Sequence, residues 1–146
     1  MRRVISNTSC LIALSNIGRL EVLQKLYGTI IITPEVRMEF GDALPDWIFV
    51  LPVSDPSRTK LIQSTLDLGE SSSIALATES DNPLLILDDG KARQFAKGMG
   101  LTLTGTLGVV IKAKQSSLIT EDIADILSAF RQHGFHMPPA IEEELS

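Results

Sequence analysis

Short apolar runs alternate with stretches of helical periodicity along this chain, a pattern that predicts β-strands alternating with α-helices. The apolar or β-branched runs predict strands at residues 3–6, 29–33, 84–87 and 101–104, with an irregular or edge strand within 44–52. Apolar residues at helical spacing, with capping residues and closing glycines, predict helices at residues 7–18, 19–26, 34–41, 56–66, 69–77, 91–99, 107–114 and 120–134. This order predicts an α/β fold with a central, mostly parallel sheet flanked by helices.

Some helix starts can be named from local chemistry. Thr120 is expected to cap the helix that Gly134 ends, with two acids following it in the first turn, and Asp55 or Ser57 is expected to cap the helix 56–66. Two prolines, Pro138 and Pro139, are expected to begin a short terminal helix.

The run at residues 84–87 predicts the central strand, because it is short, unbroken and bounded by proline before it and glycine after it. It ends in two carboxylates, Asp88 and Asp89. Ligands of open α/β sheets bind outside the carboxyl ends of the parallel strands, so both acids are candidates for a site. In the simpler interpretation, one Asp caps the following helix and the other is solvated.

Composition and charge narrow the class of protein. A chain of 146 residues with 44% hydrophobic residues predicts a single domain, residues 1–146, with a substantial core. The only cysteine, Cys10, excludes a disulfide framework, is expected to be a small buried apolar residue, and favours a reducing cytoplasmic location. We expect no secretory signal and no membrane partner, since no apolar run reaches the ~20 residues of a membrane span. The net charge of −5 argues against a basic nucleic-acid coat protein but permits a metal-dependent nuclease.

Polar and acidic residues follow several predicted strands or lie on the predicted helices next to them. They are Asn7, Glu39, Glu70, Asp88 and Asp89. In a doubly wound sheet these positions can converge on one edge, where clustered carboxylates need a cation to neutralise them. Hard oxygen ligands suit Mg²⁺ or Mn²⁺, and such a site can activate water and stabilise an in-line displacement at phosphorus.

The chain resembles the PIN-domain family along nearly its whole length. The resemblance rests on the order and spacing of several short motifs: Ser6-Asn7-Thr8-Ser9, Ile32-Thr33-Pro34-Glu35-Val36, Leu68-Gly69-Glu70, Leu85-Ile86-Leu87-Asp88-Asp89 and Thr104-Gly105-Thr106-Leu107-Gly108. It implies a three-layer α/β/α fold similar to that of RNase H-like nucleases, and cleavage of RNA with Mg²⁺ or Mn²⁺. It also implies the toxin of a toxin–antitoxin pair, blocked by a small antitoxin protein, and a homodimer.

The resemblance also assigns residues. The family's acid quartet maps onto Asn7, Glu39, Glu70 and Asp88 as catalytic residues, with Asp89 as an extra acid and the metal ligands Glu39, Glu70, Asp88 and Asp89. The residues expected to contact substrate are Thr8, Ser9, Thr106, Lys91 and Arg93. For Lys91 and Arg93 two interpretations stay open: they hold a substrate phosphate, or they are solvated residues of a helix.

Asn7 departs from the family pattern, because most PIN nucleases carry Asp at the first position of the quartet. An Asn carbonyl oxygen can still face a metal but brings no negative charge, so affinity for Mg²⁺ is expected to fall unless Asp89 restores the charge.

Three functions follow in order of preference. The first is a metal-dependent PIN-type endoribonuclease. The second is a PIN-like protein of weak or no activity that acts as a protein- or nucleic-acid-binding module. The third is another phosphate-handling domain such as a receiver, which the scattered acids disfavour. Simpler roles also stay open for single residues: Glu39 as a solvated helix residue, Glu70 as a helix-start acid, and Trp47 and Phe49 as core or interface.

Overall fold

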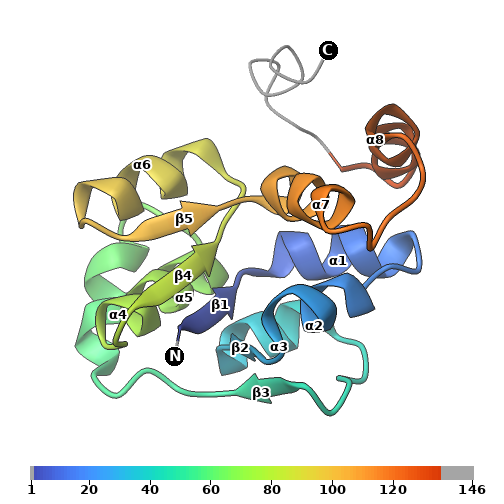
Figure 1. The fold of residues 1–146 in the computed structure, drawn as a ribbon. Coiled ribbons are helices and arrows are strands. Elements are labelled where there is room, and N and C mark those ends of the chain that lie inside the picture. Colours follow the sequence, from blue (N-terminus) through green and yellow to red (C-terminus); the bar gives the residue numbers. More distant parts are fainter. Residues whose placement is uncertain (1, 136–146) are drawn as a thin grey trace.

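A five-stranded parallel sheet forms the centre of the molecule in the computed structural model, which describes residues 2–135. Its strands are β1 (Arg3–Ser6), β2 (Ile30–Ile32), β3 (Ile48–Val50), β4 (Pro83–Ile86) and β5 (Thr102–Thr104). They lie in the order β3-β2-β1-β4-β5, and every neighbouring pair is parallel (Figure 1). The predicted parallel sheet is confirmed, with β3 as the expected edge strand.

Helices cover both faces of this sheet and confirm the three-layer α/β/α fold. The described helices are α1 (Thr8–Asn16), α2 (Glu21–Tyr27), α3 (Pro34–Phe40), α4 (Pro56–Gln63), α5 (Leu68–Thr78), α6 (Gly90–Gly98), α7 (Thr106–Gln115) and α8 (Ile123–Gln132). One core contains side chains from α1, α2, α3, α7 and α8, and the other contains side chains from α4, α5 and α6.

The two central strands supply side chains to both cores. Val4 of β1 belongs to the core beneath α1, whereas its neighbour Ile5 belongs to the core beneath α5. In the same way Leu84 and Ile86 face one layer and Leu85 faces the other. Successive residues of a strand point to opposite faces, so an unbroken apolar run is what a strand covered on both faces requires.

The carboxyl ends of β1 and β4 meet at the point where the strand order reverses. The chain proceeds from β1 to β2 and β3 on one side and from β4 to β5 on the other. Ser6 pairs with Ile86, and the Asn7 amide donates to the Ile86 carbonyl oxygen at 3.0 Å. The residues that follow the two strands therefore lie together at a switch point, where open α/β sheets bind ligands.

The start of α8 differs from the sequence prediction. Asp122, and not Thr120, occupies the N-cap position. The Lys114 ammonium group donates to the carbonyl oxygens of Thr120 and Glu121, each at 2.9 Å, and Glu121 forms an ion pair with Arg19. These contacts hold Thr120 and Glu121 in the connection between α7 and α8, so the helix begins three residues after Thr120.

The structure also tests the predicted helix at 56–66 and the predicted roles of Trp47 and Phe49. The helix expected at 56–66 ends at Gln63, and Asp55 is its cap. Trp47 packs against the core, whereas Phe49 is 52% exposed on the edge strand. The terminal helix expected after Pro138 and Pro139 lies outside the described residues.

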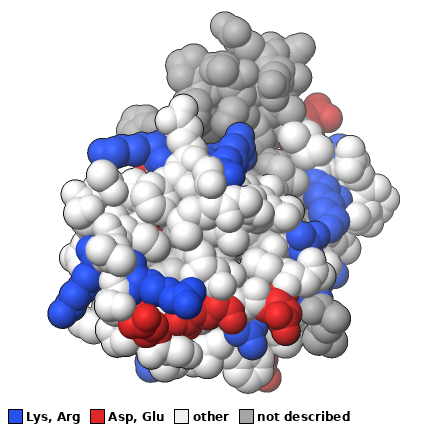
Figure 2. Space-filling model, turned by 90° about the vertical axis from the view of Figure 1, so that its left-hand side faces the viewer, with Lys and Arg blue, Asp and Glu red and all other residues white. Residues whose placement is uncertain are grey.

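Charge is distributed unevenly over the face shown in Figure 2. Its middle is mostly uncharged, basic side chains are separated from one another around it, and acidic side chains form a short band along the lower border (Figure 2). Such scattered basic residues do not form the continuous stripe that tracks a nucleic-acid backbone. None of the helices within residues 2–135 combines the length and apolar character needed to span a bilayer.

The burial of β4 predicts that shortening a side chain in this strand destabilises the fold strongly. Leu85 is fully buried in β4, so Leu85→Ala should lower the free energy of unfolding by about 2–5 kcal/mol through lost burial and a residual cavity. Leu61→Ala removes the same atoms from a side chain that is 76% exposed, and should change stability by less than about 0.5 kcal/mol. Urea unfolding followed by circular dichroism compares the two variants, and equal losses would contradict the central role of β4.

Candidate functional site

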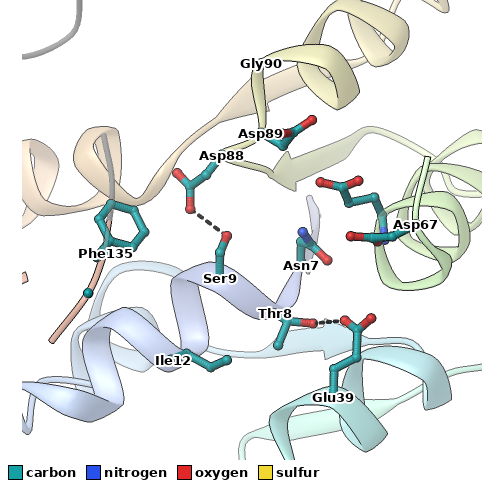
Figure 3. Close-up of a pocket in the computed structure, with 12 residues that line it drawn as sticks. Asn7, Thr8, Ser9, Ile12, Glu39, Asp67, Asp88, Asp89, Gly90 and Phe135 are labelled. Atoms are coloured by element: carbon teal, nitrogen blue, oxygen red, sulfur yellow. Dashed lines mark hydrogen bonds between the residues drawn. The ribbon is translucent and has the colours of Figure 1, made fainter. Parts of the chain in front are cut away.

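An acidic cleft of about 600 Å³ opens at the carboxyl edge of the sheet. Five carboxylates and one amide line it: Glu39, Asp67, Glu70, Asp88, Asp89 and Asn7 (Figure 3). Among the described residues, no lysine or arginine lines this cleft. The structure therefore brings together the acids that follow β4 with those of α3 and α5, as the sequence predicted.

Asn7 supplies an unpaired oxygen atom to the cleft. It occupies the N-cap position of α1, yet its side chain makes no capping hydrogen bond. The side chain is directed into the cleft (Figure 3), and its Oδ1 atom is buried with no hydrogen-bond partner among residues 2–135. A buried polar atom without a partner carries a cost of about 1–3 kcal/mol, so a donor or a cation at this position would be stabilising.

Asp88 follows β4 and is held from two directions. The Ser9 hydroxyl donates to its Oδ2 atom at 2.7 Å, and the Thr106 amide donates to Oδ1 at 2.7 Å. The Thr106 hydroxyl donates to Oδ2 as well. Because α1 and α7 supply these donors, the orientation of this carboxylate is fixed by elements on both sides of the switch point.

Glu39 reaches the cleft from the exposed side of α3. The Thr8 hydroxyl donates to its Oε1 atom, and its carboxylate lies directly against Gly69 of α5. A Cβ atom on residue 69 would lie 2.2 Å from Glu39 Oε1 and 2.8 Å from Glu39 Cδ. Only a glycine at this position leaves room for the Glu39 side chain as it stands.

Glu70 is the acid whose ionisation the cleft most disfavours. It is buried in the first turn of α5, and burial raises its pKa to about 7, with further contributions from the charges of Asp67 and Asp89. Both of these neighbours also cap helices. Asp67 Oδ1 accepts the Glu70 amide at 2.8 Å, and Asp89 Oδ2 accepts the Ala92 amide at 2.9 Å.

The expectation that one Asp of the pair caps the next helix is thus confirmed for Asp89, which lines the cleft at the same time. Cys10 is fully buried, as expected. Burial and the nearby charge of Asp88 raise the pKa of its thiol, which therefore stays protonated and unreactive.

The donor set fits a hard divalent cation. It consists of carboxylate oxygens and one amide oxygen, the atoms that Mg²⁺ and Mn²⁺ prefer. The buried Asn7 oxygen, which has no hydrogen-bond partner among residues 2–135, can accept a donor or a cation, and a cation beside Glu70 would lower its raised pKa. Within residues 2–135, no three His, Cys, Asp or Glu side chains are already arranged to hold one ion, so joint coordination requires side-chain rotation.

The remaining sequence-predicted residues lie around the cleft at different depths. Thr8 and Ser9 line it, whereas Thr106 is fully buried behind Asp88. Lys91 is exposed on α6, and the Arg93 guanidinium donates to the Leu87 carbonyl oxygen at 2.7 Å, at the end of β4. Of the described residues, those that line the cleft do not include Lys91 or Arg93.

Sequence reasoning missed Asp67, Ile12 and Phe135, which also line the cleft. Asp67 could have been predicted from the sequence as a helix N-cap, because an Asp three residues before a Glu at a helix start matches the capping pattern. Ile12 and Phe135 had none, since both are apolar residues in or next to amphipathic helices. Only the tertiary structure, which places the residues after α8 beside α1, brings them to the cleft.

The raised pKa of Glu70 predicts a pH-dependent stability. The carboxyl of an unfolded chain ionises near pH 4.5 and this one near pH 7, so the native state holds the proton longer and loses stability as pH rises between these values. At pH 8 the loss is about 3 kcal/mol, at about 1.4 kcal/mol for each tenfold change in a proton equilibrium. Glu70→Gln should therefore raise the melting temperature at pH 8 much more than at pH 4.5.

Thermal unfolding at the two pH values measures this difference. Glu21→Gln, in the first turn of α2, is the matched control for removing a helix-start carboxylate outside the cleft. Equal effects of Glu70→Gln at both pH values would contradict the raised pKa.

The contact between Gly69 and Glu39 predicts a coupling between the two positions. Gly69→Ala should change stability by less than about 1 kcal/mol, because the added methyl group displaces only the end of the exposed Glu39 side chain, and the lost hydrogen bond with Thr8 offsets the gain of Ala over Gly in a helix. In a Glu39→Ala background nothing is displaced, and the same change should stabilise by about 1 kcal/mol. Gly98→Ala, where a Cβ meets nothing within 4 Å, is the control in α6. Additive effects in this double-mutant cycle, measured by urea unfolding, would contradict the contact.

Comparison with known proteins supports the assignment that the motifs suggested. The model of a family described as a PIN domain matches residues 3–145, which is nearly the entire chain. A search of curated proteins found no match. PIN domains are generally nucleases and typically use divalent metal ions. The family match and the five-stranded parallel sheet with its acidic edge agree with each other, and the chain belongs to the PIN-domain family.

Proposed function

We propose that this protein is a divalent-metal-dependent endoribonuclease. The observation that carries the proposal is the acidic cleft at the switch point, where five carboxylates surround an unpaired Asn7 oxygen in a PIN domain. Such a concentration of acids without a lining cation is costly for an apoprotein and suits a site that takes up metal ions. Fold by itself does not fix an activity, so the proposal depends on these residues.

The carboxylates of Glu39, Glu70 and Asp88 would hold Mg²⁺ or Mn²⁺, with Asp89 and the Asn7 carbonyl oxygen completing the site. A bound divalent ion supplies the positive charge that polarises an attacking water and offsets negative charge building on the phosphate. Thr8 and Ser9 fix the orientations of Glu39 and Asp88 through hydrogen bonds. Thr106 supports Asp88 from behind, and Lys91 is exposed beside the cleft for contact with a phosphate.

Asn7 sets the strength of this site. An Asp at that position would add a sixth carboxylate to the cleft, whereas the amide offers an oxygen without charge. We therefore propose a weaker metal affinity than that of an otherwise identical protein with Asp at position 7. The toxin role, the antitoxin partner and the homodimer are further proposals, and they rest on the family resemblance alone.

A second candidate function is a PIN-like module that binds protein or nucleic acid without cleaving it. Two observations favour it: the uncharged Asn7, and the absence from residues 2–135 of three acids already arranged around one ion position. The two candidates differ in whether the native site binds metal and cuts RNA, which a set of single substitutions can decide.

Cleavage of a mixed single-stranded RNA pool with Mn²⁺ or Mg²⁺ tests the proposed function. The native protein should cut, and Asp88→Asn should lower the rate by more than about 100-fold, since loss of residues that only support metal ligands already costs about 10–100-fold. Asn7→Asp should raise both activity and Mn²⁺ affinity. Asp81→Asn makes the same chemical change at an exposed residue before the amino end of β4, and should leave activity unchanged.

Mn²⁺ binding measured by calorimetry accompanies the cleavage assay. If only Asn7→Asp cuts and binds Mn²⁺, the native protein is the binding module with a disabled site. If none of the variants cuts or binds Mn²⁺, the acidic cleft is not a metal site.

A further inference from the structure

Phe135 is fixed at the mouth of the acidic cleft by the way α8 ends. Gly134 adopts a φ of +84°, which an L side chain rarely tolerates, and turns the chain back on itself. The Phe135 amide then donates to the Phe130 carbonyl oxygen at 2.9 Å. The two rings contact each other with centroids 5.3 Å apart and an interplanar angle of 50°. A side chain held in this way is a preformed surface and loses little freedom when a ligand covers it.

An apolar groove adjoins the cleft at this point. It has a volume of about 190 Å³ and lies between α1 and the end of α8, lined mainly by Ile12, Ala13, Phe130 and Phe135. Ser9, Ile12, Gly134 and Phe135 line both the groove and the cleft, so the two are continuous. Ile12 is 41% exposed, and Figure 3 shows Phe135 beside Ser9 and Asp88, with Ile12 on the same side of the cleft.

The charges of the cleft limit how a nucleic acid can be held there. Five carboxylates line it and no lysine or arginine does so within residues 2–135, so the walls themselves repel a phosphate backbone. Bound metal ions offset this repulsion at the reacting phosphate alone. Apart from Lys91 beside the cleft, the lining offers the neighbouring nucleotides contacts that do not depend on charge, and stacking of a base on an aromatic ring is such a contact.

We infer that Phe135 and Ile12 form a binding site for one nucleobase of a single-stranded RNA, next to the phosphate that the acids would engage. This inference rests on the proposed function. A ribose lying at Ser9 would direct its phosphate toward Asp88 and its base into the adjoining groove. Asn16 and His133, at the polar rim of the groove, are placed to hydrogen-bond with the edge of the base. Stacking on Phe135 accepts any base, so the site contributes affinity with little sequence preference.

Fluorescence of Phe135→Trp tests base binding directly. The natural chain has a single tryptophan, Trp47. The emission spectrum of the variant minus that of the native protein therefore reports on residue 135. A short single-stranded RNA, added in EDTA and then in Mn²⁺, should quench or shift this difference spectrum. An abasic strand with the same sugar–phosphate backbone should not. An equal response to both strands, or no response to RNA under either condition, would overturn the inference.

Steady-state cleavage provides the second measurement. Phe135→Ala and Phe135→Leu should each raise KM about 5- to 150-fold, which corresponds to the 1–3 kcal/mol of a base–aromatic stack, with a smaller effect on kcat. Phe135→Leu keeps an apolar contact with Phe130, which separates stacking from folding. Phe49→Ala removes a 52% exposed aromatic side chain outside the cleft and should leave KM unchanged.

The two proposals fail in different ways. If the native protein cuts no RNA but Phe135→Trp still distinguishes RNA from the abasic strand, the base site stands and the nuclease does not. Suppose that the native protein cuts RNA, that Phe135→Ala and Phe135→Leu have its KM, and that Phe135→Trp responds equally to RNA and to the abasic strand. In that case the nuclease stands and the base site does not. If Phe135→Trp fluorescence changes when an apolar peptide is added but not when RNA is added, the groove is instead a protein-docking site.

Discussion

The pairing of β1 with β4 is the constraint on which the rest of the molecule depends. It places two chain segments that are about eighty residues apart side by side, with Ser6 opposite Ile86. The strand order reverses at this pair, so the helices that follow β1 and β4 leave the sheet in different directions and a cleft remains between them. Asn7 and Asp88 stand at the two sides of that opening because each is the first or second residue after its strand.

The cleft that results is organised at a cost to stability. Glu70 is buried beside Asp67 and Asp89, and burial together with these two charges raises its pKa to about 7 and so disfavours its ionisation. The fold offsets part of this cost by giving the neighbouring acids structural roles: Asp67 and Asp89 cap α5 and α6, and Ser9 and Thr106 donate to Asp88. Strain retained at a site in this manner is common where binding a ligand supplies the compensating energy.

Phe135 adds a different kind of surface to the same opening. The acids attract cations and repel phosphates, whereas the ring and Ile12 offer an apolar contact that ionic strength hardly affects. The two surfaces meet at Ser9, so a nucleotide held there would expose its phosphate to one and its base to the other. Both surfaces meet at one opening because the residues that follow α8 lie beside α1. This placement connects the outermost described helix with the centre of the sheet.

The sequence by itself predicted the strands, most helices and four of the five acids that line the cleft, because local signals carry that information: unbroken apolar runs, proline and glycine boundaries, and acids after strands or on the neighbouring helices. It could not fix the start of α8, where Lys114 and Arg19 hold residues 120–121 outside the helix. It also could not show that Gly69 gives room to Glu39, that Thr106 supports Asp88 from behind, or that Phe135 reaches the cleft. Each of these contacts joins elements far apart along the chain. Their distances are set by how helices pack on the sheet, and only the tertiary structure decides them.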